Sequence, residues 1–125
     1  MIFGIGTDIV HVSRMHDSLA KHGEKFARRI LTQAEFSEFK NKSNQSAFLA
    51  KRFAAKEAAA KAMGTGFSGG LSLRHIGVTH DNAGKPLLEF LEIADEFIHH
   101  NKIKQTHLSL ADERDYAVAF VTLSL

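Results

Sequence analysis

Two carboxylates and one lysine have the residue types that handle phosphate groups. Asp8 follows two glycines near the N-terminus, and Glu57 precedes Lys61 by one helical turn in an alanine-rich segment. Mg²⁺ is usually held by one or two carboxylates and takes its other ligands from water and substrate phosphates. If Asp8 and Glu57 meet in the fold, they could hold such an ion. Lys61 could then offer a positive charge to the same phosphate.

The same residues also have a purely structural interpretation. Glutamate four residues before lysine is the favourable order for an ion pair on a helix surface, worth a few tenths of a kcal/mol. Taken alone, Glu57 and Lys61 favour this interpretation. Gly4 and Gly6 share one strand face with Asp8, which indicates that something approaches the backbone there, and tight packing alone would explain it.

Three elements would position these side chains. The sequence predicts a strand at residues 2–11 and a long helix from Ala47 to Met63, which contains no glycine or proline. On that helix, Glu57 and Lys61 share a face. Gly64 to Gly70 predict a loop whose backbone N–H groups can approach an anion.

The rest of the chain predicts short helices and strands. The first half predicts a helix from Ser13 that is broken in two at His22-Gly23, and a helix opened by a Thr32–Glu35 capping box. The second half predicts strands at 76–80 and 86–91 joined by a hairpin turn at Asp81–Lys85, a helix at 92–101, and paired strands at 106–111 and 115–125. In the 92–101 helix, Ile93, Phe97 and Ile98 are expected to be buried.

Composition narrows the class of protein. The chain has 125 residues, of which 44% are hydrophobic and 24% charged, so we expect one folded domain over 1–125. The absence of cysteine excludes disulfides, thiolate metal sites and cysteine nucleophiles. No apolar run is long enough for a bilayer, and the N-terminus lacks the pattern of a signal peptide. A cytoplasmic location is therefore expected.

Charge is unevenly distributed along the sequence. Residues 1–62 carry eleven Lys or Arg against six Asp or Glu, whereas the rest of the chain is acidic. A basic half suits an acidic partner, which could be a phosphate compound, a nucleic acid or an acidic protein surface. A solvated helix surface would explain the charge equally well.

Several segments together resemble a known family. They are Gly4-Ile5-Gly6-Thr7-Asp8-Ile9-Val10, the stretch from Arg52 through Lys56-Glu57 and Lys61 to Gly64-Thr65-Gly66, Gly84-Lys85-Pro86, and His107-Leu108-Ser109. In this order they are similar to the holo-[acyl-carrier-protein] synthases, the small bacterial 4′-phosphopantetheinyl transferases. The lysine-glutamate core joined to Gly-Thr-Gly is the most specific part.

The resemblance implies an α+β fold with a small antiparallel sheet packed against one long central helix. It implies an enzyme that transfers 4′-phosphopantetheine from coenzyme A to a serine of apo acyl carrier protein and releases adenosine 3′,5′-bisphosphate. Magnesium would be the cofactor, and a homotrimer with active sites between subunits is implied. Such an enzyme activates the carrier for fatty acid synthesis.

The resemblance also assigns site residues. Asp8 and Glu57 would bind Mg²⁺, and Asp8, Glu57 and Lys61 would serve catalysis. Residues implied to line the coenzyme A site are Arg52, Phe53, Lys61, Gly64, Thr65, Gly66, Pro86 and His107, while Arg14 and Lys21 would face the carrier protein. The base that takes the serine proton stays open between Glu57 and a water molecule on the metal.

Two segments depart from the family pattern. His11 stands where an acidic residue is common, which leaves any ion pair at that point in doubt. Ala111-Asp112-Glu113-Arg114 replaces a Ser or Thr followed by His, and predicts an altered hairpin. Without the resemblance to this family, His107 would be interpreted as a structural histidine. With the resemblance, a role at the nucleotide is as favoured as a structural role.

Two other functions compete with this assignment. One is a basic module that binds nucleic acid through residues 14–61, and the other is a relative that binds the carrier without turnover. A nucleic-acid binder would lose affinity steeply with salt and would not need Asp8 or Glu57. We expect neither nucleic acid nor a membrane among the partners.

Overall fold

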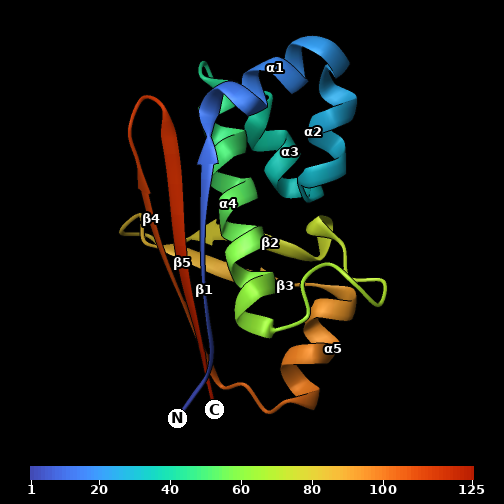
Figure 1. The fold of residues 1–125 in the computed structure, drawn as a ribbon, viewed down its shortest axis with the longest axis vertical. Coiled ribbons are helices and arrows are strands. Elements are labelled where there is room, and N and C mark those ends of the chain that lie inside the picture. The colour runs from blue at the N-terminus through green and yellow to red at the C-terminus, as the bar shows by residue number, and fades with distance from the viewer.

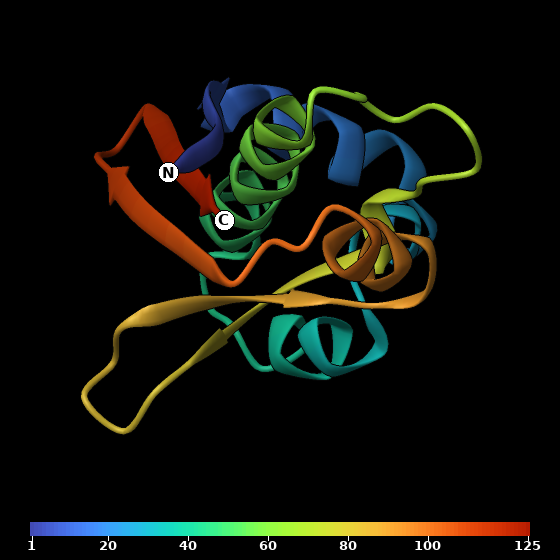
Figure 2. The same ribbon diagram turned by 90° about the horizontal axis from the view of Figure 1, so that it is seen from below.

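Helix α4 (Gln45–Met63) runs through the centre of the computed structural model, which describes residues 1–125 (Figure 1). A three-stranded sheet lies along one side of α4, and the shorter helices and a two-stranded hairpin surround its other sides (Figure 2). The remaining elements are β1 (Ile2–His11), α1 (Val12–His22), α2 (Glu24–Ile30), α3 (Gln33–Phe39), the 3₁₀ helix η1 (Leu73–His75), β2 (Ile76–His80), β3 (Pro86–Phe90), α5 (Glu92–His100), β4 (Gln105–Asp112) and β5 (Tyr116–Ser124). The α+β fold with a long central helix is confirmed.

The main sheet is antiparallel throughout, with strand order β1-β5-β4. Phe120 of β5 lies opposite Thr7 of β1 on one side and Ser109 of β4 on the other. The terminal strands of the chain are therefore neighbours, and the predicted pairing of the last two strands is confirmed. Strands β2 and β3 form a separate antiparallel hairpin.

Strand β1 packs directly on the backbone of α4. A Cβ atom added to Gly4 would overlap the carbonyl oxygen of Ala62, and one added to Gly6 would overlap that of Ala58. The two missing side chains let the sheet approach the helix this closely. What approaches the glycines is therefore α4 itself, and this packing holds Asp8 beside the helix.

Helix α4 begins two residues earlier than predicted and ends as predicted. The Asn44 side chain accepts a hydrogen bond from the Ala47 N–H at 3.1 Å and caps the first turn. At the other end Gly64 adopts φ 81°, a left-handed conformation that suits glycine. Most of α4 is buried, because its alanines leave room for neighbours on several sides.

The predicted capping box of α3 is present. Thr32 Oγ1 accepts from the Glu35 N–H at 3.2 Å, and Glu35 Oε1 accepts from the Thr32 N–H at 2.9 Å. The turn between β2 and β3 is also as expected, with Asp81 Oδ1 accepting from the N–H groups of Ala83 and Lys85.

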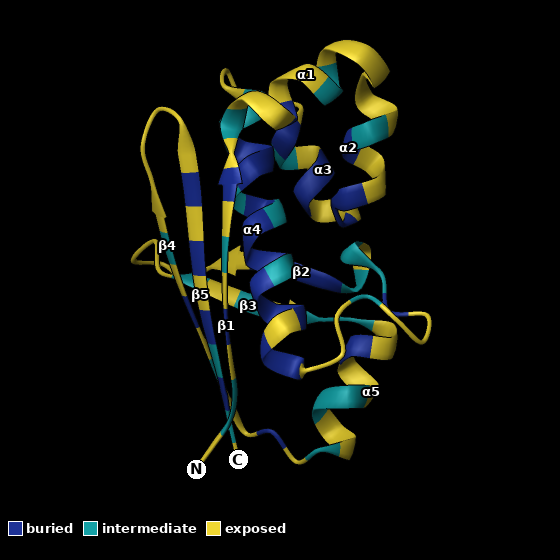
Figure 3. Cartoon of the chain, viewed as in Figure 1, coloured by how far each residue is buried: buried dark blue, intermediate teal, exposed yellow.

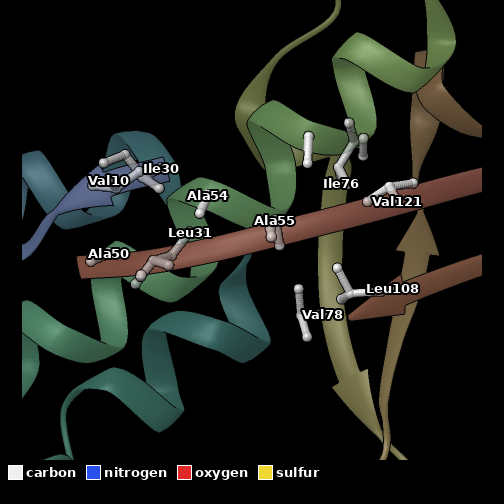
Figure 4. Packing of buried hydrophobic residues seen from close by; sticks show 14 of the residues in the cluster. Val10, Ile30, Leu31, Ala50, Ala54, Ala55, Ile76, Val78, Leu108 and Val121 are labelled. Carbon is white, nitrogen blue, oxygen red and sulfur yellow. The ribbon is translucent and has the colours of Figure 1, made fainter. Parts of the chain in front are cut away.

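The core forms one cluster of 26 buried residues between α4 and its neighbours (Figure 3). Side chains that meet there include Ala50, Ala54 and Ala55 of α4, Ile76 and Val78 of β2, Leu108 of β4 and Val121 of β5 (Figure 4). The prediction that Ile93 is buried was wrong. Ile93 is 36% exposed, and Ala94 is the fully buried residue of α5. Phe97 and Ile98, also predicted to be buried, are half-buried and pack against the core. None of the helices combines the length and apolar character needed to cross a bilayer.

Candidate active site

Strand β1 and helix α4 bring Asp8 and Lys61 into contact. The Lys61 Nζ atom lies 3.1 Å from Asp8 Oδ1 and donates to the Thr7 carbonyl oxygen at 2.9 Å. The simple surface pair between Glu57 and Lys61 does not form, because Lys61 turns toward β1 instead. Lys61 is thus a tether between the two elements as well as an exposed cation.

The carboxylate of Glu57 lies in the field of Asp8. Burial raises the pKa of Glu57, and the negative charge of Asp8 raises it further, while Lys61 and Arg14 act in the opposite direction. Two carboxylates whose charges oppose each other gain from a cation placed between them. Asp8 and Glu57, predicted as partners from the sequence, therefore belong to one electrostatic cluster.

The donor set of this cluster fits magnesium better than a transition metal. The structure has no group of three or more His, Cys, Asp or Glu side chains that could hold a metal alone. Two carboxylates suit an oxygen-seeking ion that completes its shell with water and substrate phosphates. Mg²⁺ is such an ion, and Asp8 and Glu57 are the residues that would hold it.

Helix α1 reaches the same cluster. The Arg14 guanidinium lies 5.3 Å from the centre of the Phe53 ring, and Phe53 occupies the face of α4 that carries Glu57. Lys21 lies in the last turn of α1 and is exposed. Arg14 therefore borders the carboxylates, whereas Lys21 extends the basic surface away from them.

A second group of predicted residues lines a different hollow. A groove of about 690 Å³ runs between the start of α4, the β2–β3 turn and strand β4. Arg52 and Pro86 line it, and so does Gly84 of the Gly84-Lys85-Pro86 segment. Lys42 and Lys51 add positive charge to the same walls.

Arg52 is the buried cation of this groove. Its side chain is 5% exposed, its guanidinium lies 4.5 Å from the centre of the Phe48 ring, and one terminal nitrogen lies 3.7 Å from Glu38 Oε1. Burial lowers the pKa of Arg52, and Glu38 opposes this change. The Nε atom has no hydrogen-bond partner, which is costly for a buried polar group and suits a ligand anion.

The glycine loop is positioned by α4 and does not point all its amides outward. The Gly64 N–H donates to the Lys61 carbonyl at 3.0 Å, and the Gly66 N–H donates to the Ala60 carbonyl at 3.3 Å. The sequence predicted that backbone N–H groups of the loop from Gly64 to Gly70 can approach an anion, and two of these groups bond the helix end instead. Thr65, between them, is exposed, and its hydroxyl donates to the Gly66 carbonyl at 2.9 Å.

His107 lies on the opposite face of the main sheet from Asp8 within one chain. It sits opposite Thr122 on the sheet face that points away from α4, whereas Asp8 lies opposite the buried Ala119 on the face toward α4. The structure thus brings Asp8, Glu57 and Lys61 together, gathers Arg52 and Pro86 elsewhere, and leaves His107 on an outer surface.

His11 has a local role that the sequence did not reveal. Its Nδ1 atom accepts from the Ser13 N–H at 3.3 Å and caps α1, and its ring lies 4.7 Å from that of Tyr116. The position usually acidic in the family therefore serves here as a helix cap. No ion pair is needed there.

Sequence reasoning missed several residues of the groove. Glu38, Lys42, Lys51 and His80 line it with Arg52 but carry no motif of their own. The only signal was the basic character of the first half of the chain.

Comparison with known proteins identifies the family of the chain. The family model described as the 4′-phosphopantetheinyl transferase superfamily matches residues 4–121. A holo-[acyl-carrier-protein] synthase of Nitrosococcus oceani is 57% identical over 123 residues, covering 98% of this chain and 80% of the relative. The chain therefore belongs to the 4′-phosphopantetheinyl transferase superfamily.

Solved structures place the fold in the same family. The crystal structure of holo-[acyl-carrier-protein] synthase from Neisseria meningitidis superposes with a TM-score of 0.95 at 45% identity, and covers 100% of both chains. A holo-(acyl-carrier-protein) synthase from Bacillus anthracis in complex with CoA (3′,5′-ADP) superposes with a TM-score of 0.82 at 38% identity, covering 100% of this chain and 99% of that one.

Proposed function

We propose that this protein transfers the 4′-phosphopantetheine group of coenzyme A to a serine hydroxyl of apo acyl carrier protein. Adenosine 3′,5′-bisphosphate is the second product, and the modified carrier is ready for fatty acid synthesis. The observation that carries the proposal is the cluster of Asp8, Glu57 and Lys61, in a chain that belongs to the transferase superfamily.

The chemistry requires positioning and charge neutralisation more than covalent help from the protein. Attack of the serine oxygen on the β-phosphorus of a pyrophosphate creates charge on the phosphate oxygens and on the leaving group. Mg²⁺ held by Asp8 and Glu57 would neutralise part of this charge when bound. The ammonium of Lys61 stabilises charge that develops on the leaving group. No protein nucleophile is needed.

Coenzyme A is assigned to the groove as well as to the carboxylates. The unpartnered Nε of Arg52 and the neighbouring Lys42 and Lys51 suit a phosphate of the nucleotide, and Pro86 offers an apolar wall. The Gly64-Thr65-Gly66 turn continues from the end of the helix that holds Lys61, which puts it in reach of the same substrate.

The carrier protein is assigned to helix α1. Arg14 borders the carboxylates and Lys21 extends the basic face, so an acidic carrier docked there would bring its serine toward the reacting phosphate.

We further propose a homotrimer whose active sites lie between subunits. The outer face of the main sheet carries the exposed apolar side chains Ile5, Ile9, Val118 and Phe120, and no element of this chain covers it (Figure 3). His107 lies on that same face. Contact between copies would bury the apolar residues and bring His107 near a neighbour's site.

Intact-mass spectrometry tests the activity directly. Apo acyl carrier protein incubated with this protein, coenzyme A and Mg²⁺ should gain the mass of one phosphopantetheine. The gain should disappear with a chelator and with the Glu57→Ala variant. Absence of any gain with folded protein and several carriers would refute the transferase assignment.

Mixing an inactive variant with one impaired in coenzyme A binding tests the shared site. The assay uses coenzyme A far below the KM of Arg52→Met, where this variant turns over slowly. If Glu57 and Arg52 of one active site come from different subunits, mixing Glu57→Ala with Arg52→Met after dissociation should restore about a quarter of the activity, because random assembly rebuilds some intact sites. If both residues act within one subunit, the mixture shows no more activity than its share of Arg52→Met alone.

A further inference from the structure

Lys56 and Glu35 form a buried ion pair next to the candidate site. The two side chains are 0% and 3% exposed, and Lys56 Nζ lies 2.7 Å from Glu35 Oε1. Lys56 precedes Glu57 in the sequence, but its ammonium group bonds Glu35, Leu73 and Ile76 and takes no part in the carboxylate cluster. Neither residue has a role in the proposed chemistry.

Every donor of Lys56 is used to hold another segment. Besides Glu35, its Nζ atom donates to the carbonyl oxygen of Leu73 at 3.1 Å and to that of Ile76. An ammonium group has three donors, so none is left over. Lys56 thereby fastens η1 and the start of β2 to the middle of α4.

Glu35 completes the same connection from the other side. Its Oε2 atom accepts from the Val78 N–H at 2.8 Å, and its Oε1 atom accepts from the Thr32 N–H at 2.9 Å as well as from Lys56. The side chain links the start of α3 to strand β2 and to α4. Gly77, between the two tied residues of β2, packs so tightly that an added Cβ would lie 3.2 Å from Thr32 Cγ2.

The tied segments are those that carry the proposed coenzyme A contacts. The loop that begins at Gly64-Thr65-Gly66 ends at η1, so Lys56 fixes its far end while α4 fixes its near end. Strand β2 leads into the turn with Gly84 and into Pro86, which line the Arg52 groove. Asp8 and Lys61, by contrast, are held by the packing of β1 on α4 and do not depend on the pair.

We propose that Lys56 and Glu35 are positioning residues for coenzyme A, because they hold the glycine loop and the β2–β3 hairpin at a fixed place against α4. The inference rests on the proposed function. A buried ion pair is a poor source of net stability, but it fixes one arrangement of the segments that it joins. Loss of the pair should therefore weaken nucleotide binding more than it slows the chemical step.

The test uses the neutral variant Glu35→Gln/Lys56→Gln, which removes both buried charges and keeps hydrogen-bonding groups. The KM for coenzyme A and its calorimetric Kd should rise about tenfold, the lower end of the roughly 10–100-fold loss that follows removal of residues that orient metal ligands. The kcat at saturating coenzyme A and the KM for the carrier protein should change less than about twofold. Hydrogen exchange in residues 64–85 should become faster.

A second variant and a control make the result decisive. Glu35→Gln alone leaves the buried Lys56 ammonium without a counter-charge and places an amide donor against the Val78 N–H, so it should raise the KM for coenzyme A by at least as large a factor as the double variant. Val121→Ala leaves a cavity under the sheet without touching the pair, and should lower the melting temperature while leaving the KM for coenzyme A unchanged.

Three outcomes would overturn the proposal. The first is an unchanged KM and Kd for coenzyme A in a folded double variant, and the second is an equal rise of this KM in Val121→Ala. The third is failure of both glutamine variants to fold, which would make the pair a requirement for folding and not for positioning. If the unmodified protein transfers nothing, the proposed function fails, and the hydrogen exchange of residues 64–85 still decides whether the pair holds the two segments.

Discussion

Replacing Gly6 by alanine should separate strand β1 from helix α4. The added Cβ would overlap the Ala58 carbonyl oxygen and lie 2.7 Å from the Ala62 backbone nitrogen. Both are backbone atoms, so no side-chain rotation can relieve the overlap. The strand must move outward, and the sheet must move with it.

The cost of this movement follows from the packing it breaks. Without the overlap, alanine in a strand would gain roughly 0.5–1 kcal/mol over glycine. Overpacking of a well-packed core costs about 1–3 kcal/mol and more when backbone must shift, so we expect a loss of about 3 kcal/mol in the free energy of unfolding. For a chain of 125 residues this lowers the melting temperature by roughly 10 °C.

The same movement should impair the site, since Asp8 follows Gly6 on the inner face of β1. A displacement of about 1 Å at a catalytic group can cost on the order of 100-fold in rate. Thermal unfolding and the initial rate of carrier modification measure the two effects. Ser37→Ala is the control, because Ser37 is exposed on helix α3 and belongs to neither β1 nor α4, and it should change both quantities little.

A double variant distinguishes the cause. Ala58→Gly removes only the Ala58 methyl group, so it should not rescue Gly6→Ala if the overlap is with backbone. Unchanged or increased stability of Gly6→Ala would refute the close packing of β1 on α4, and rescue by Ala58→Gly would refute the role of the carbonyl oxygen.

Three further predictions concern the site and the surface. Glu57→Gln without divalent cations should have a higher free energy of unfolding than the unmodified protein at neutral pH, because the raised pKa of Glu57 means that its ionised form destabilises the folded state. This gain should vanish in urea titrations run below the ordinary glutamate pKa of 4.5, where the carboxyl group is protonated in both states. The variant should also lose activity. Arg52→Met should raise the KM for coenzyme A about tenfold or more by steady-state kinetics, since a buried charged donor is removed, and an unchanged KM would place the nucleotide elsewhere. Phe120→Asp should convert the assembly to monomers in light scattering, and a persistent trimer would show that the outer sheet face is not the interface.

Local features of the fold could be predicted because they depend on residues close together in the sequence. The two residues of the Thr32–Glu35 capping box are separated by 3 positions, and the bonds that close the Asp81 turn join residues separated by 2 and 4 positions. Helix α4 followed from its alanines and from the glycine after Met63. The family could be identified for a related reason, since its most specific motif lies within a single helix and the loop that follows.

Contacts between distant segments could not be predicted in this way. From spacing alone, Lys61 was a candidate partner for Glu57, but it pairs with Asp8 at a separation of 53 residues. Glu35 was assigned only to its cap, yet it also neutralises Lys56, which lies 21 residues away. Side-chain partners depend on which helices and strands pack together, and the spacing of residues along the sequence does not specify that packing.

The sequence by itself determined which residue types are available to the site: two carboxylates, a lysine one helical turn beyond Glu57, and a glycine-rich loop. The tertiary structure decided how they are grouped. It placed Asp8 on the inner face of the sheet and His107 on the outer face, because alternate residues of a strand point to opposite sides and only α4 covers one of them. It also buried Arg52 with a free Nε in a groove formed by three distant segments, which no local pattern records.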